Sequence, residues 1–454
     1  MRRAAEWFFR ALGAIYLIAF VSFGVQAEGL IGPRGILPLG AYLSAMHQDM
    51  GTRAWWYAPT VFWLASGSAA LRIAWLFGAL LAIAVIMGWF RRICLVLLLI
   101  LYLSICTAGQ DFWSFQWDIL LLEAGFLAIF LDASTGRVRL MRWLLFKLMW
   151  MSGLVKLTSG DATWRNLTAL SYHYLTQPLP TPIAWYMYQL PMWFQKASTA
   201  FTLAVELGAP LLIFAPLRLR RVAGCLIAGL QILILLTGNY TFFNWLTLAL
   251  CLFLFPERPV RTAPATWTHR GVSAVLALFV IGTGGLQFLE MLSFPLPSAA
   301  ASYLSWIAPM RIVNTYGLFA DMTTTRPEIV IEGSQDAQHW RPYEFRYKPG
   351  DLHRAPPWVA PYQPRLDWQM WFAALGSARQ NPWFFNFAIR LMQGSPPVLG
   401  LLRGNPFPAS PPRYLRALVY DYRFTSWAER RATGNWWTRK EEATYLPVVS
   451  LRGR

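Results

Sequence analysis

Long apolar runs alternate with short polar segments over the first two thirds of the chain. Nine of these runs have the length of about 17–25 residues that an α-helix needs to cross a bilayer. They lie near residues 7–27, 71–89, 93–109, 113–131, 140–158, 197–215, 221–238, 240–256 and 271–292. The pattern therefore predicts a polytopic α-helical membrane domain over residues 1–292, with about nine transmembrane helices.

The pattern changes after Leu292. Pro295 and Pro297 end the last apolar run, charged residues become more frequent, and no later run is long enough to span a bilayer. Alternating residues predict strands at Glu328–Ser334, Tyr343–Asp351, Tyr414–Phe424 and Tyr445–Leu451, and helices are expected at Asp367–Ala374, Pro382–Met392 and Pro397–Leu402. We therefore expect residues 293–454 to form one extramembrane α+β domain that contains an antiparallel β-sheet.

The composition agrees with a membrane protein. Hydrophobic residues make up 56% of the chain and charged residues only 14%, whereas soluble domains have about 25% charged residues. A net charge of +18 would suggest nucleic acid as a partner of a soluble protein, but much of the excess here is arginine in loops between apolar runs. The four cysteines all lie in apolar runs without C-x-x-C spacing, so neither a disulfide framework nor a thiol redox site is expected.

Arginine residues are concentrated in every second loop. The loops of one side hold Arg2, Arg3, Arg10, Arg91, Arg92, Arg137, Arg139, Arg142, Arg218, Arg220, Arg221, Arg258, Arg261 and Arg270. The loops of the other side hold only Arg34, Arg53, Arg165 and a few residues at helix ends. Because positively charged loops stay in the cytoplasm, the N-terminus is predicted to be cytoplasmic. The loop 158–196 and residues 293–454 are then predicted to lie on the opposite face.

Ionisable side chains occur inside the fourth, fifth and sixth apolar runs. Charges within a bilayer are costly, and they are found in ion pairs or at functional sites. At a rise of about 1.5 Å per residue, Asp118 and Lys156 fall at similar outer depths, whereas Glu123 and Glu206 fall near mid-depth with Lys147 somewhat further in. We predict ion pairs between Asp118 and Lys156, and between Lys147 and either Glu123 or Glu206. Such pairs would either join helices or line a polar cavity that opens to the outer face.

A polar and aromatic segment, Gly153–Pro182, lies between the fifth and sixth runs. A simple connection between helices needs only about two to eight residues, so a segment of this length suggests a site. Its hydrogen-bonding and aromatic residues next to Lys156 include Asp161, Trp164, Arg165, Asn166 and His173. We interpret these residues, together with the charges in the neighbouring spans, as an outer-face cluster in which Lys156 and His173 are candidate catalytic residues.

No metal site and no cofactor are expected from the sequence. His173 has no second histidine at metal-ligand spacing, and the motifs H-x-x-x-H and H-E-x-x-H are absent. The nucleophile motif G-x-S-x-G is absent as well, which leaves a serine-hydrolase site unsupported.

The stretch Ala360–Gly376 is dense in tryptophan, arginine and proline and is predicted to contain an amphipathic helix. Tryptophan and arginine dominate the hot spots of protein interfaces. The candidate partner-binding residues are Arg365, Asp367, Trp368 and Trp371. A structural role would instead bury both tryptophans and pair the arginine with an acid. We predict that this burial occurs and that a client protein contacts the flanking loop, Pro356–Pro364.

Two long stretches resemble the lipase maturation factor family. They are SGLVKLTSGDATWRNLTALSYHYLTQPLPTP, Ser152–Pro182, and the tryptophan-rich region from Asn314 to Gly376, which NPWFFNFAIRLMQGSPPVLGLLRGNPFP, Asn381–Pro408, continues. The resemblance covers nearly the whole chain and implies a multi-pass membrane protein. In eukaryotes this family resides in the endoplasmic reticulum membrane and helps lipases to fold and assemble. The short loops and scarce cysteines favour a bacterial member, whose outer domain would lie in the periplasm.

A shorter stretch, GLVKLTSGDATW, is also similar to the vitamin K-dependent γ-glutamyl carboxylase family. That resemblance implies a membrane enzyme that acts on a lipid or quinone, with Lys156 as the catalytic base. Desolvation would allow a lysine to act as a base, whereas a nearby carboxylate such as Asp118 would favour its charged form. We therefore expect a membrane-embedded maturation or folding factor for secreted or membrane proteins, possible clients being secreted lipases. A membrane enzyme is the alternative hypothesis.

Overall fold

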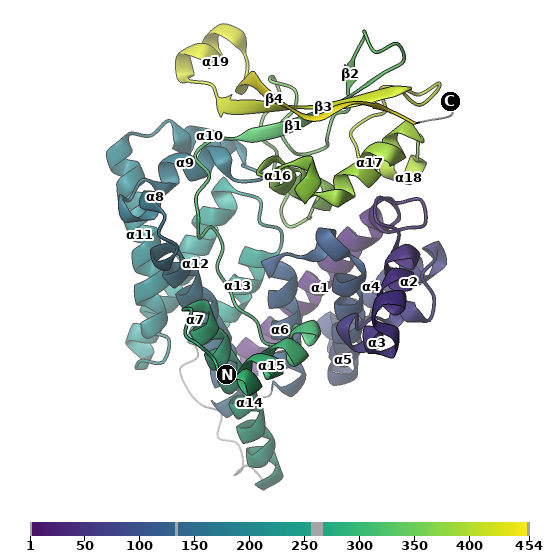
Figure 1. Ribbon diagram of the computed structural model, residues 1–454. Coiled ribbons are helices and arrows are strands. Elements are labelled where there is room, and N and C mark those ends of the chain that lie inside the picture. Colours follow the sequence, from purple (N-terminus) through teal and green to yellow (C-terminus); the bar gives the residue numbers. More distant parts are fainter. Residues whose placement is uncertain (1, 132–134, 256–266, 452–454) are drawn as a thin grey trace.

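A bundle of long helices carries a small β-sheet at one end, and three helices lie between the two (Figure 1). The computed structural model describes residues 2–131, 135–255 and 267–451. Within these residues the predicted fold class is confirmed, because the chain is a membrane protein with apolar spanning helices and an antiparallel sheet near its C-terminus. The strands and their covering helices, residues 327–450, are called the sheet domain below.

Each of the nine predicted apolar runs corresponds to a helix of the bundle. These helices are α1 (Arg2–Leu30), α4 (Ser68–Met87), α5 (Arg91–Ala108), α6 (Gln116–Phe130), α7 (Thr135–Thr158), α11 (Met192–Leu211), α12 (Leu217–Thr237), α13 (Phe243–Cys251) and α14 (Trp267–Met291). Five of them, α1, α4, α5, α12 and α14, are by themselves long and apolar enough to cross a membrane. The other four are shorter or more polar, so the count of nine spans stays a prediction.

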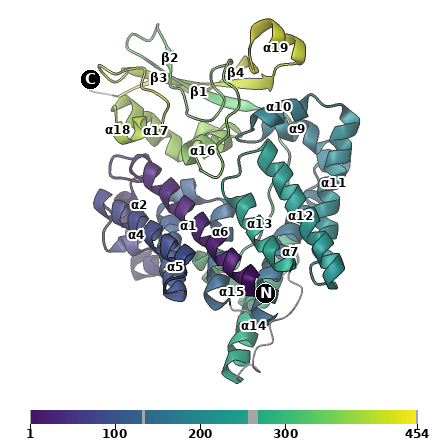
Figure 2. The ribbon, with the colours of Figure 1, turned by 180° about the vertical axis from the view of Figure 1, so that it is seen from behind.

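Short helices fill the longer connections of the bundle. They are α2 (Leu39–Met50) and α3 (Ala54–Tyr57) before α4, then α8 (Ala162–Arg165), α9 (Ala169–Thr176) and α10 (Pro182–Tyr188) before α11, and α15 (Ser298–Ile307) after α14. Helices α8, α9 and α10 cap the end of the bundle that carries the sheet (Figure 1). Seen from behind, α1 runs through the bundle between α4 and α13, in agreement with its contacts to both (Figure 2).

The sheet has the strand order β2-β1-β3-β4, and all its pairs are antiparallel. Its strands are β1 (Pro327–Ser334), β2 (Arg341–Pro342), β3 (Tyr414–Phe424) and β4 (Trp437–Ser450). The predictions for β1 and β3 are confirmed, and β4 begins earlier than predicted. The covering helices α16 (Arg365–Ala374), α17 (Pro382–Met392) and α18 (Pro396–Leu399) also lie where the sequence predicts helices, whereas α19 (Trp427–Thr433) was not predicted.

The prediction of a strand over Tyr343–Asp351 is wrong. The backbone N–H groups of Tyr347 and Lys348 donate instead to one carboxylate oxygen of Asp367, each over 2.8 Å. The Lys348 ammonium is buried and lies 2.9 Å from the carboxylate of Glu328. Within the described residues, only the first residue of the segment makes a backbone hydrogen bond to a strand, since the Tyr343 N–H donates to the Ile331 carbonyl of β1 over 2.8 Å. The rest wraps around the two buried carboxylates, and these groups are already bonded there.

One continuous hydrophobic core joins the sheet domain to the bundle. Aromatic rings pack across the junction, with the Trp117 and Trp368 ring centroids 4.7 Å apart and those of Phe112 and Trp383 5.4 Å apart. Such aromatic pairs add about 0.5–1.5 kcal/mol each beyond the area they bury. The sheet domain is therefore fixed on the bundle by packing and does not hang from a linker.

Candidate functional site

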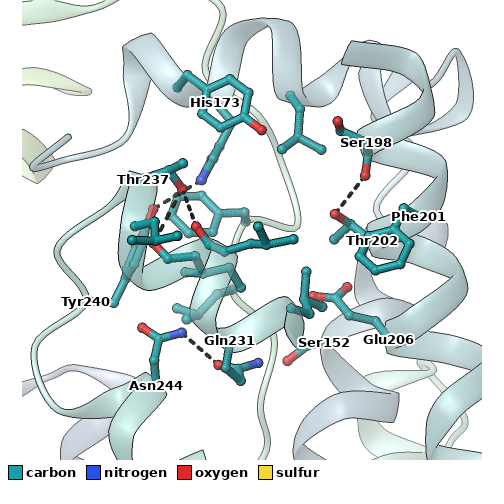
Figure 3. Close-up of a pocket in the computed structure, with 18 of the residues that line it drawn as sticks. Ser152, His173, Ser198, Phe201, Thr202, Glu206, Gln231, Thr237, Tyr240 and Asn244 are labelled. Carbon is teal, nitrogen blue, oxygen red and sulfur yellow. Dashed lines mark hydrogen bonds between the residues drawn. The ribbon is translucent and has the colours of Figure 1, made fainter. Parts of the chain in front are cut away.

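A cavity of about 440 Å³ lies where the bundle meets its cap of short helices. Helices α7, α9, α10, α11, α12 and α13 contribute to its wall. Most of the lining is apolar and includes Met149, Phe194, Phe201, Leu230, Leu233 and Phe243. The polar lining residues include Lys156, His173, Glu206, Gln231, Tyr240 and Asn244, and Figure 3 shows how several of them surround the open centre. A cavity of this size with few polar groups has the form of a small-molecule site.

A buried ion pair forms part of the cavity wall. The Lys156 ammonium lies 2.7 and 2.8 Å from the two carboxylate oxygens of Glu206 and also donates to the Ser152 carbonyl over 3.0 Å. Gly153 makes this pairing possible, because a Cβ atom at that position would lie only 2.9 Å from the Glu206 Cβ atom. Glycine thus allows α7 and α11 to approach each other closely.

The predicted pair between Asp118 and Lys156 is wrong. Asp118 lies in the first turn of α6, beneath the sheet domain, and its two oxygens accept hydrogen bonds of 2.7 and 2.8 Å from Arg365. The Tyr102 hydroxyl donates to the same carboxylate over 2.6 Å. The prediction compared only depth in the bilayer, and depth does not determine which way a helix faces.

The predicted pair between Glu123 and Lys147 is confirmed, with a distance of 2.6 Å and both side chains buried. The second oxygen of Glu123 accepts hydrogen bonds from the Asn314 backbone N–H, over 2.9 Å, and from the Tyr316 hydroxyl, over 2.8 Å. The pair therefore holds in place the chain segment that leads from α15 to the sheet. The pair therefore serves to join elements of the fold, which is one of the two roles that the sequence suggested for such pairs.

His173 projects from α9 and lines the cavity. The Tyr240 hydroxyl donates to the Gln177 side-chain oxygen over 2.8 Å, because the Gln177 amide nitrogen itself donates to the Thr237 carbonyl over 2.9 Å. Nε2 of His173, 3.2 Å from that hydroxyl, must then be the donor of the pair. Burial of the ring lowers the pKa of His173 to about 4, and the nearby Lys156 ammonium makes a smaller contribution in the same direction. The imidazole is therefore neutral at pH 7, with Nδ1 as an acceptor.

Asp161 and Trp164 hold α8 against the chain that leads to the sheet. Asp161 caps α8, and its carboxylate accepts hydrogen bonds from the backbone N–H groups of Thr163, over 2.7 Å, and Met322, over 2.5 Å. Burial alone would raise the pKa of Asp161, but these hydrogen bonds lower it. The indole N–H of Trp164 donates to the Phe319 carbonyl over 2.9 Å, and its ring lines the cavity.

The structure does not bring the predicted cluster together at one place. Arg165 and Asn166 are exposed and do not line the cavity, unlike Lys156, Trp164, His173 and Glu206. Sequence reasoning missed Tyr240, Gln231 and Asn244, of which the last two share a hydrogen bond of 2.7 Å. The sequence did carry a signal for Gln231 and Asn244. They are amide side chains in two neighbouring apolar runs, and an amide inside a bilayer needs a hydrogen-bond partner.

The four candidate partner-binding residues are buried. Arg365 and Asp367 are each 2% exposed, Trp368 is 3% exposed and Trp371 is 7% exposed. The predicted burial of the tryptophans and the pairing of Arg365 with an acid are thereby confirmed. The side chains of all four residues lie between the sheet and the bundle and have no surface to offer a partner, so their interpretation as partner contacts is wrong.

The loop Pro356–Pro364 is also largely enclosed. The Asn239 side-chain oxygen accepts hydrogen bonds from the backbone N–H groups of Val359, over 2.8 Å, and Ala360, over 2.9 Å. Trp358, in contrast, is 56% exposed. A client could therefore touch this loop at Trp358, but not along its whole length.

Known proteins resemble the chain along its whole length. Residues 3–262 match the model of the lipase maturation factor transmembrane domain, and residues 312–447 match that of the lipase maturation factor C-terminal domain. Lipase maturation factor 2 of Gallus gallus is 36% identical, with 99% of this chain and 82% of the relative covered. Lipase maturation factor 1 of Bos taurus is 35% identical, with coverages of 98% and 89%. No solved structure matches. The chain belongs to the lipase maturation factor family.

Proposed function

We propose that this protein is a membrane-embedded maturation factor that helps secreted or membrane proteins, such as a secreted lipase, to reach their folded state. The observation that carries the proposal is that both domains of the family are matched and occur in one chain. The alternative of a membrane enzyme with Lys156 as base gains no support from the site. All three hydrogens of the ammonium are engaged by Glu206 and Ser152, and a base would have to give one up beside a carboxylate.

The client surface that we propose consists of exposed apolar side chains of the sheet domain. These are Trp358 and, on or beside α16 and α17, Phe372, Leu375, Phe385 and Ile389, which are 38–56% exposed. Exposed apolar surface on a folded domain commonly marks a site of interaction. A partly folded client still exposes apolar segments of its own, and burying them against these side chains would be favourable.

Deletion of the gene in its native host should lower the amount and activity of specific secreted proteins at unchanged transcript levels. Clients that fail to mature are degraded, so we expect their abundance to fall several-fold. Quantitative proteomics of the secreted fraction, together with lipase assays, measures the effect, and a plasmid copy of the gene should reverse it. An unchanged secreted fraction with an altered membrane lipid or quinone would instead favour the enzyme.

The deletion strain, carrying a plasmid copy of the gene, also tests the proposed client surface. A photo-crosslinking amino acid at Phe385 or Ile389 should capture the clients whose levels fall on deletion. The matched control position is Glu442, which is exposed on β4 but polar. Equal capture of these clients from Glu442 would argue against the proposed surface.

We further propose that the protein lies in a bacterial inner membrane, with a cytoplasmic N-terminus and a periplasmic sheet domain. The beginning of α1 lies at the end of the bundle away from the sheet (Figures 1 and 2). Fusions of alkaline phosphatase and green fluorescent protein after Arg139, Arg220 and Arg454 should report cytoplasm, cytoplasm and periplasm, because the arginine-rich loops remain inside. Fluorescence of the fusion after Arg454 would reverse the proposed orientation.

A further inference from the structure

The cavity opens sideways, toward the lipid. Phe201 on α11 and Leu233 and Leu236 on α12 line the cavity and are also 41%, 51% and 40% exposed. We place the mouth of the cavity at these three side chains. Because exposed apolar side chains on membrane helices face lipid, the mouth between α11 and α12 leads into the bilayer.

The lining carries no net charge. Its ionisable residues include one cation, Lys156, and one anion, Glu206, and these two neutralise each other within 2.8 Å. His173 also lines the cavity, and because its pKa is lowered to about 4, its imidazole is uncharged at pH 7. A charged head group would therefore enter this apolar space without a counter-charge, at a large cost in desolvation.

Hydrogen-bonding capacity is left over at the cavity. Besides the ion pair, the polar lining of the cavity includes Thr237 and Tyr240 on one wall. The side chains of Ser198 and Thr202 lie on the opposite wall, on α11 (Figure 3). The Thr202 hydroxyl donates to the Ser198 carbonyl over 2.9 Å, so its lone pairs can still accept a hydrogen bond. A ligand that brings a hydroxyl group would therefore fit beside Ser198 and Thr202.

We propose that the cavity binds one uncharged, hydroxyl-bearing lipid. Its head lies beside Ser198 and Thr202, and its hydrocarbon chain passes between α11 and α12 into the bilayer. A phospholipid fits less well, because its phosphate needs a cation and the Lys156 ammonium is already held by Glu206 and Ser152. A site of this kind is independent of client binding, so either proposal can fail without the other.

The test uses the full-length protein in nanodiscs and a monooleoylglycerol with a diazirine in its acyl chain. Illumination should attach this probe to α11 and α12. Thr202→Phe fills the cavity from its wall, and we expect it to reduce labelling about tenfold, equivalent to about 1.4 kcal/mol of binding. The matched control is Ala204→Phe, which adds the same ring on the same helix at an exposed position that does not line the cavity. Labelling of this control should equal that of the wild type.

Two further measurements complete the test. A lysophosphatidic acid with the same diazirine chain should label weakly, and Ser198→Ala, which removes a hydroxyl without filling the cavity, should reduce labelling by the neutral probe. If Thr202→Phe proves unstable in a thermal melt, Ser198→Leu replaces it. Labelling that is equal in the filled variant and the wild type, or stronger with the phosphate probe, would overturn the proposal.

Discussion

Replacing Arg365 with methionine should destabilise the protein by about 3–5 kcal/mol, the usual effect of removing one partner from a buried ion pair. Arg365 and Asp118 are 2% and 0% exposed, and two hydrogen bonds of 2.7 and 2.8 Å join them. Without the guanidinium, a carboxylate remains buried where the sheet domain meets the bundle. The measurement is the midpoint of thermal unfolding in detergent, with membrane abundance as a second readout.

A second substitution separates loss of the pair from loss of packing. Arg365→Met combined with Asp118→Asn removes both charges, while the amide oxygen can still accept from the Tyr102 hydroxyl, so the double variant should regain most of the stability. The control is Arg416→Met, whose partner Glu332 belongs to a more exposed pair and whose loss should cost about 1 kcal/mol or less. If Arg365→Met is no less stable than this control, the pair does not hold the domains together.

Lys156→Ala should have an effect of similar size, about 3 kcal/mol, because it leaves Glu206 buried without a partner. Exchange of the charges, Lys156→Glu with Glu206→Lys, should restore part of the stability that either single variant loses. Lys196→Ala is the control, since that lysine is exposed at the start of α11. Unfolding midpoints and membrane abundance measure the effect.

The same variants distinguish a structural role of Lys156 from a catalytic one. If the lysine only holds α7 to α11, client maturation should follow the abundance of each variant, and the charge exchange should restore both together. Loss of all function in Lys156→Ala at normal abundance would instead support a base. Full function with Lys156→Ala would exclude the enzyme alternative altogether.

The length of the apolar runs was enough to predict the helices of the bundle, and alternation was enough to predict β1 and β3. The choice of partners within the bundle was not predictable in the same way. Asp118 and Lys156 were predicted at similar depths, but α6 packs beside α5 beneath the sheet domain, whereas α7 packs beside α11. Gly153 was the one local signal of that second contact, because a helix interior seldom carries glycine without a packing reason.

The candidate site was predicted in part for a related reason. Lys156, Trp164, His173 and Glu206 differ from the apolar residues around them, and this contrast is visible in the sequence. The role of Arg365 was harder to predict, because its partner is distant in sequence and belongs to another domain. An arginine and two tryptophans on one helix fit a recognition surface and a buried junction equally well, and only the packing of α16 distinguishes the two.

The contact between Asp118 and Arg365 also has a consequence for biogenesis. The two residues are 247 positions apart, so the ribosome delivers the carboxylate long before it delivers the guanidinium. Until then, the beginning of α6 carries an acid without its cation, and the newly inserted helices remain an incomplete platform. A nascent chain that stops before Arg365 should therefore be a substrate for membrane quality control, even with all its spans in place.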